Sequence, residues 1–165
     1  MSKNNEAADI IINQAGKEYK DIDKTLNLDT PSLTFLLALY GLANDNFIEY
    51  WNKSSENNEH SFSRTTYSKN SSEYDSYFGL ITLLKHMGEP VDEITKIAFE
   101  STSDNNVSFN KLENVRNYYG YLVGGTKLLH YDIFKNGKDK SEVALALFEI
   151  LQKSNIYDTS RLKIG

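Results

Sequence analysis

The chain has 165 residues, carries a formal net charge of −5 at pH 7 and contains no cysteine. This length fits one domain that buries about 70% of the surface its unfolded form exposes, so the fold needs no cross-links. The lack of cysteine excludes disulfides, cysteine-ligated zinc, iron–sulfur clusters and thiol catalysis. No apolar run reaches the ~18 residues of a membrane span, and the run at residues 10–12 is too short for a signal peptide, which predicts a cytoplasmic protein without a membrane partner.

The charge is distributed unevenly along the chain. Residues 1–101 hold 9 Lys and Arg against 16 Asp and Glu, whereas residues 102–165 hold 9 against 7. A protein that binds nucleic acid on its own usually has a net positive charge, which displaces counterions from the phosphates. The acidic part can face a basic partner, but we favour the interpretation that it is an ordinary solvated surface.

The first predicted helix spans residues 5–26, where apolar side chains recur at helical spacing. Asp29 or Thr30 is expected to cap a second helix over residues 31–52, and Pro31 suits its first turn. The polar run at residues 44–46 is a point where this second helix can divide. The apolar stripes are Ala8, Ile11, Ala15, Tyr19, Ile22 and Leu26 in the first helix, and Leu33, Leu36, Tyr40, Ala43, Phe47 and Tyr50 in the second.

Residues 52–72 are predicted to form a long flexible loop, because they are rich in Ser, Asn and Glu and show no sustained period. Loops of about 20 residues are unusual inside a compact domain and are mostly functional or disordered. Disorder is the simpler expectation, although Phe62, Tyr67 and Tyr74 interrupt or flank the stretch.

The later part of the chain is predicted to contain shorter helices at residues 72–87, 90–101 and 141–153. Gly88 is placed to stop the first of these, and Ser141 is placed to cap the last. The side chains expected to face inward from the last helix are Val143, Ala144, Leu147, Phe148, Ile150 and Leu151.

The longest regular stretch, residues 108–134, is predicted to be the central helix of a bundle. Seven residues spaced alternately three and four apart form one packing stripe: Leu112, Val115, Tyr119, Leu122, Thr126, Leu129 and Ile133. Gly120 and Gly124 lie one turn apart, so another backbone can approach there. No fixed repeat occurs. The sequence therefore predicts a single-domain, all-α bundle of five or six helices over residues 1–165, ending in a tail at 154–165.

The sequence contains no complete catalytic or metal-binding motif. His130 and Asp132 are the best polar pair, but residues two apart in a helix do not face each other. An enzyme stays open as a third hypothesis, and it would need His130 with Asp132 or with a carboxylate from another helix. His86 lies in the last turn of its helix, where a cation suits the helix dipole. Neither HExxH nor the ExxH of helical di-iron proteins occurs. We therefore predict no catalytic residue, no metal site and no cofactor.

Tyrosine is abundant, at 11 of the 20 aromatic residues. Tyr118, Tyr119 and Tyr121 are nearly consecutive, so they are not expected to face one core together, and exposed Tyr is enriched at protein interfaces. The alternative is a packed ring with its hydroxyl in water, which is at least as common. The candidate partner-binding residues are Tyr118, Tyr121, Phe62, Tyr67 and Tyr74.

The leading functional hypothesis is an intracellular protein-interaction module without catalytic activity: an adaptor, a regulator, or an inhibitor- or immunity-type protein. It rests on the missing catalytic motifs, the acidic charge, the tyrosine-rich edges and the 52–72 loop. Neither the partner nor the oligomeric state follows from the sequence, and a homo-oligomer stays open. The alternative is a small helical subunit of a nucleoprotein complex that contacts nucleic acid through basic residues of its C-terminal half: Lys135, Lys138, Lys140, Arg161 and Lys163.

Overall fold

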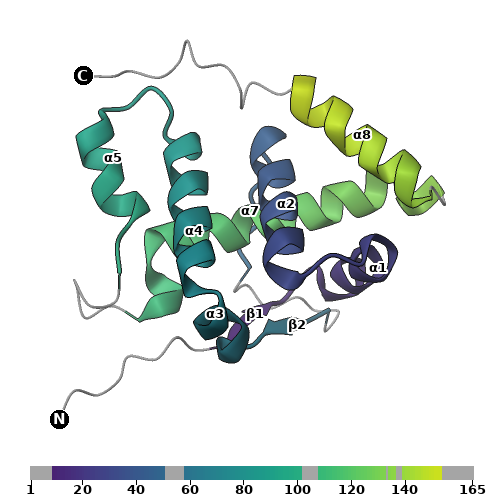
Figure 1. Cartoon of the computed structure of the whole chain (residues 1–165), viewed down its shortest axis with the longest axis horizontal. Helices are drawn as coiled ribbons and strands as arrows, with labels where there is room; N and C mark the ends of the chain where they lie inside the picture. The colour runs from purple at the N-terminus through teal and green to yellow at the C-terminus, as the bar shows by residue number, and fades with distance from the viewer. Residues whose placement is uncertain (1–8, 51–57, 102–107, 133, 137–138, 154–165) are drawn as a thin grey trace.

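In the computed structural model, the long helix α7 (Glu113–Asp132) is the centre of the molecule, and the other elements pack around it (Figure 1). Helices α2 (Thr30–Ala43) and α4 (Ser71–Lys85) both cross α7, and α1 (Gly16–Leu26) packs against another side of it. The predicted all-α bundle with residues 108–134 at its centre is therefore confirmed. The structure describes residues 9–50, 58–101, 108–132, 134–136 and 139–153.

A short antiparallel ribbon of β1 (Ile10–Ile12) and β2 (His60–Phe62) packs against this bundle (Figure 1). The register pairs Ile10 with Phe62, Ile11 with Ser61 and Ile12 with His60. The predicted helix 5–26 is therefore wrong at its start, since α1 begins only at Gly16. Three consecutive β-branched side chains favour a strand, and Ile11 is exposed between two buried neighbours, which is the two-residue period of a strand.

Most of the predicted loop at 52–72 forms regular structure instead. Residues 58–72 include β2, the short helix α3 (Arg64–Lys69) and the start of α4. The Ser63 side chain caps α3 by accepting a hydrogen bond from the Thr66 backbone N–H at 3.2 Å. Elements this short span too few residues to show a period, so the sequence pattern did not reveal them. Loop residues 52–57 lie outside the described part of the chain.

The second predicted helix, 31–52, ends early. α2 has the expected Asp29 cap, whose side chain accepts from the Ser32 backbone N–H at 3.0 Å, and Pro31 lies in its first turn. It ends at Ala43, and Asp45 takes a left-handed backbone conformation with φ of 49°. The polar run at 44–46 therefore turns the chain rather than continuing the helix, as the short polar side chains of Asn and Asp allow.

Close approach of backbones at glycine holds α2 against α7. A Cβ at Gly41 would collide with the carbonyl oxygen of Tyr121, and a Cβ at Gly125 would collide with that of Leu37. After α2 the chain returns along α7, where the Asn46 side-chain amide donates to the Gly124 carbonyl at 2.8 Å. A Cβ at Gly124 would strike the Asn46 carbonyl, so the predicted backbone approach at this glycine is confirmed.

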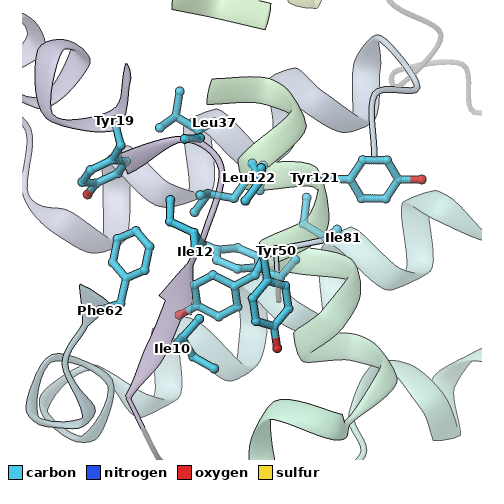
Figure 2. Close-up of a cluster of buried hydrophobic side chains, with 14 of the residues drawn as sticks. Ile10, Ile12, Tyr19, Leu37, Tyr50, Phe62, Ile81, Tyr121 and Leu122 are labelled. Carbon is cyan, nitrogen blue, oxygen red and sulfur yellow. The ribbon is translucent and has the colours of Figure 1, made fainter. Parts of the chain in front are cut away.

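The predicted packing stripe of the central helix is also confirmed. Six of its seven members are buried, and Ile133 lies outside the described residues. The helix starts later than predicted: residues 109–111 form a 3-10 turn, η1 (Phe109–Lys111), and α7 begins at Glu113. Figure 2 shows part of the core around the packing stripe of α7, where side chains from the strands, α2 and α7 meet.

The remaining elements flank this core. Gly88, with φ of 99°, follows α4 as predicted and leads into α5 (Val91–Ala98). After the 3-10 turn η2 (Phe134–Asn136), α8 (Lys140–Lys153) lies over the far end of α7 (Figure 1). The predicted tail at 154–165 lies outside the described residues. Among the helices of the described part, none is long and apolar enough to span a membrane.

Candidate functional site

Four of the five predicted partner-binding aromatics lie inside the core. Tyr118 and Tyr74 are 0% and 1% exposed, and Tyr121 and Phe62 are 5% and 6% exposed. The Tyr118 hydroxyl donates to the Thr34 hydroxyl at 2.9 Å, and burial raises the pKa of Tyr118 well above its usual value. The premise that these four residues offer a contact surface is therefore wrong.

The reason is that α7 has neighbours on almost every side. α1, α2, α4 and α5 all contact it, and between Asn114 and Thr126 only Arg116 is exposed. Consecutive tyrosines that point in different directions can therefore all be buried. Tyr121 comes nearest to the surface, and in Figure 2 its hydroxyl points away from the other labelled side chains.

Tyr67 is the one predicted contact residue that is only half-buried. Its hydroxyl donates to Asp75 at 2.8 Å, and its ring lies 4.6 Å from the ring of Phe109. Burial and the hydrogen bond to Asp75 raise the pKa of this tyrosine. Tyr67 lines a hollow of about 180 Å³ that is mainly apolar and is bounded by Phe78, Phe99, Phe109, Leu112, Val115, Asp75, Asn114, Glu100 and Ser101.

A second hollow adjoins the first and is much more polar. It has a volume of about 450 Å³ and shares Glu100 and Leu112 with its neighbour. Its remaining lining residues are Phe47, Lys85, Lys111, Glu113, Arg116 and Asn117. We call this hollow the basic groove, because three cations line it against two carboxylates. The sequence pattern did not reveal it, since its residues come from four separate segments.

The predicted pair of His130 and Asp132 does not form. His130 instead places Nε2 3.1 Å from a carboxylate oxygen of Asp21 on α1, while Asp132 is exposed. This contact joins α1 to α7 at the surface, since both side chains are part-exposed. Across the described residues, no three His, Asp or Glu side chains converge to hold a metal ion.

His86 ends α4 between two carboxylates. Its Nδ1 lies 3.0 Å from Glu89, and its Nε2 lies 3.5 Å from Glu113 without making a hydrogen bond. The imidazole therefore connects the last turn of α4 to the first turn of α7. This places His86 at the helix end, where the sequence predicted it.

The predicted basic set is described only in part. Lys135 is exposed, with its Nζ 5.0 Å from the ring centroid of Tyr131. Lys138, Arg161 and Lys163 lie outside the described residues, as does the side chain of Lys140 in α8.

The α8 helix exposes large apolar side chains. Leu145 and Phe148, three residues apart and thus on one face, are 60% and 59% exposed, and Ala144 is exposed beside them. Phe148 and Ala144 were predicted to face inward, and that prediction is wrong. Eight of the nine residues from 143 to 151 are apolar, so packing one side of the helix on the bundle leaves apolar residues on the other. The other side chains predicted inward lie outside the described part.

The capping of α8 also differs from the prediction. Asp139 rather than Ser141 is the capping residue, because its carboxylate accepts from the Ser141 and Glu142 backbone N–H groups at 2.9 and 3.0 Å. The Glu142 side chain in return accepts from the Asp139 backbone N–H at 3.0 Å, which completes a capping box. The start of α8 is thus fixed by its own sequence.

The sequence matches no protein-family model, and neither the curated proteins nor the solved structures include a significant match.

Proposed function

We propose that this chain is an intracellular, cytoplasmic protein-interaction module, of the adaptor, regulator or inhibitor type, that docks on its partner through α8. The observation that carries the proposal is the exposure of Leu145 and Phe148, at 60% and 59%, on one face of a helix. We call this face, made of Ala144, Leu145 and Phe148, the α8 face.

The α8 face has the chemistry of an interface anchor. Burying a leucine or phenylalanine that is otherwise exposed contributes about 1.5–3 kcal/mol, and a few such anchors dominate a typical interface. Scattered single apolar residues on a surface need no explanation, but two large ones one turn apart on a mostly apolar helix are a contact motif. The capping box at Asp139 and Glu142 holds the helix in shape before binding, which lowers the ordering cost of association.

The charges beside the α8 face indicate the surface chemistry of the partner. Glu142 and Glu149 are exposed, lie two turns apart on α8 and stand three and four residues from Leu145, on the same side of the helix. A helix of this kind fits an apolar groove whose rim carries Lys or Arg side chains. The partner we propose is therefore a protein with an apolar groove and a basic rim.

The test is affinity capture from the native host with the full chain as bait, before and after nuclease treatment. The double variant Leu145→Glu/Phe148→Glu removes the α8 face, and Leu28→Glu is the matched control, because Leu28 is 40% exposed on the loop between α1 and α2. We expect one stoichiometric protein on the wild type and the control and none on the double variant. Equal capture on all three baits contradicts the proposal.

Two other outcomes of these experiments would support a different function for the chain. Loss of the captured material after nuclease treatment would favour the nucleoprotein alternative, and charge reversal at Lys138 and Lys140 should then weaken retention in a salt-dependent way. A concentration-dependent dimer that the double variant abolishes would instead assign the α8 face to a second copy of this chain. Sedimentation equilibrium on the purified protein distinguishes that case.

A further inference from the structure

The basic groove lies between the end of α4 and the first turn of α7, on elements that do not include α8. Lys85, Lys111 and Arg116 line it, opposed by Glu100 and Glu113. Among its described lining residues the groove therefore has three positive and two negative charges, in a chain whose net charge is −5. A local excess of cations in a concave site on an acidic protein focuses a positive potential where an anion can enter.

Lys85 is held in place at the groove wall by two contacts. Its Nζ donates to the Asn117 side-chain oxygen at 2.7 Å and lies 5.7 Å from the ring centroid of Phe47. The Asn117 amide nitrogen in turn donates to the Thr82 hydroxyl at 3.2 Å, so both ends of the asparagine are fixed. An ammonium has three donors, and a fixed one loses little conformational freedom when it binds a ligand.

The start of α7 adds to this potential. α7 is a helix of 20 residues, and its first turn supplies Glu113 and Arg116 to the lining. The backbone N–H groups at the start of a helix, together with its dipole, favour an anion nearby. The carboxylate of Glu113 occupies one part of this region, where it lies 3.5 Å from His86. Glu113 and Glu100 are both opposing charges in the described lining of the groove.

We propose that the basic groove binds a small phosphate-bearing molecule through Lys85, Lys111 and Arg116. Lysine and arginine both make charge-assisted hydrogen bonds to phosphate oxygens. A volume of about 450 Å³ accommodates a phosphate group with a small organic body. Phe47 supplies an apolar wall for that body.

This site is separate from the interaction proposed for α8, so either proposal can fail without the other. The probe is pyrophosphate, titrated into the full chain and followed by calorimetry and by amide chemical shifts. We expect saturable binding with a Kd of about 1 mM or tighter. The largest shifts should map to the first turn of α7 and the last turn of α4.

Two lysine variants test whether pyrophosphate binds specifically at the basic groove. Lys111→Met removes an exposed groove cation, and Lys20→Met removes an exposed lysine from α1, which does not line the groove. We expect Lys111→Met to weaken pyrophosphate binding about tenfold, as the loss of one charge-assisted hydrogen bond implies, and Lys20→Met to leave it unchanged. Thermal unfolding of each variant confirms that it is folded.

Three results would overturn the proposal. The first is no saturable binding of pyrophosphate, and the second is equal weakening by both variants, which indicates only general charge attraction. The third is tighter binding of citrate than of pyrophosphate with the same dependence on Lys111, which would assign the groove to carboxylates rather than phosphates. A Lys85→Met variant that also loses pyrophosphate binding while staying folded would support the proposal independently.

Discussion

The hydroxyl of Tyr118 is hydrogen-bonded inside the core, and that one contact determines how the residue responds to substitution. The group is fully buried and donates to Thr34 at 2.9 Å. Thr34 in turn donates to the backbone carbonyls of Thr30 and Pro31, so the first turn of α2 and the middle of α7 share one hydrogen-bond network. Such networks fix the relative placement of the helices that they join.

Tyr118→Phe should therefore lower the free energy of unfolding by about 1 kcal/mol, the usual loss for one buried hydrogen bond. The matched control is Tyr131→Phe, since Tyr131 is 64% exposed, and it should stay within about 0.5 kcal/mol of the wild type. Urea unfolding of the three proteins measures both values. Equal stabilities for the two variants would show that the Tyr118 hydroxyl contributes nothing to the fold.

The buried tyrosines also predict an alkaline limit to stability. Burial raises the pKa of Tyr40 and of Tyr50 to about 12, whereas an unfolded tyrosine ionises near pH 10. Between these values the folded protein binds more protons than the unfolded chain, so the free energy of unfolding falls as pH rises above about 10. Below pH 10 both states hold these protons, and the pH dependence from this source vanishes.

Circular dichroism and tyrosinate absorbance, followed together in an alkaline titration, test that prediction. We expect a large part of the tyrosinate signal to appear only with the loss of helix. A tyrosinate signal that follows the curve measured in urea while the helices stay intact would contradict it. The same titration in urea, where all tyrosines are in water, is the control.

At the scale of elements, the crossing of α2 over α7 depends on glycine at the point of contact. A Cβ at Gly125 would meet backbone atoms of Leu37 and Gly41, which cannot move without separating the helices. The atoms nearest to a Cβ at Gly120 belong to the ring of Phe47, which is 38% exposed and can swing aside. The two glycines are on the same helix, so their intrinsic helix propensity is the same.

Gly125→Ala should thus destabilise the protein by about 1–3 kcal/mol, the typical cost of overpacking, even though alanine is the better helix former. Gly120→Ala should cost clearly less, because only a side chain has to move. Thermal unfolding of the two variants compares them directly. A Gly125→Ala variant as stable as Gly120→Ala would rule out a close backbone contact at this crossing.

The sequence predicts elements well where one periodic pattern continues over several turns. The stripe from Leu112 to Leu129 runs along one face of α7 and marks it as central, and the Asp29 cap marks the start of α2. Three-residue strands cannot show such a pattern, and Ile11 of β1 also fits a helical stripe because it lies at helical spacing from Ala8 and Ala15. Its partner β2 lies some 50 residues later, and that distant pairing is what makes it a strand.

Candidate site residues were harder to predict, because exposure depends on what surrounds a helix rather than on the helix itself. Tyr118 and Tyr121 look like edge residues on a helix with one buried face, yet α7 is covered on nearly all sides. The basic groove joins Lys85 to Lys111 and Arg116 across the fold, and no local spacing signals such a cluster. The apolar character of α8 was visible in the sequence, but which of its side chains stay in water was not.

At the scale of the whole molecule, the described side chains of the core lie between Ile10 and Phe134, in the elements and connecting segments that precede α8. α8 follows that core and presents the α8 face to solvent. We therefore propose that two roles are separate: the bundle around α7 supplies the stability, and the α8 face is left free to contact a partner.

The most direct test of this separation is the free energy of unfolding of Leu145→Glu/Phe148→Glu, measured by urea titration of the purified protein. Because both side chains are mostly in water, we expect the double variant to stay within about 0.5 kcal/mol per substitution of the wild type. A loss of more than about 3 kcal/mol would contradict the account, because it is the cost of putting charge into a packed core and would mean that the chain itself buries the α8 face.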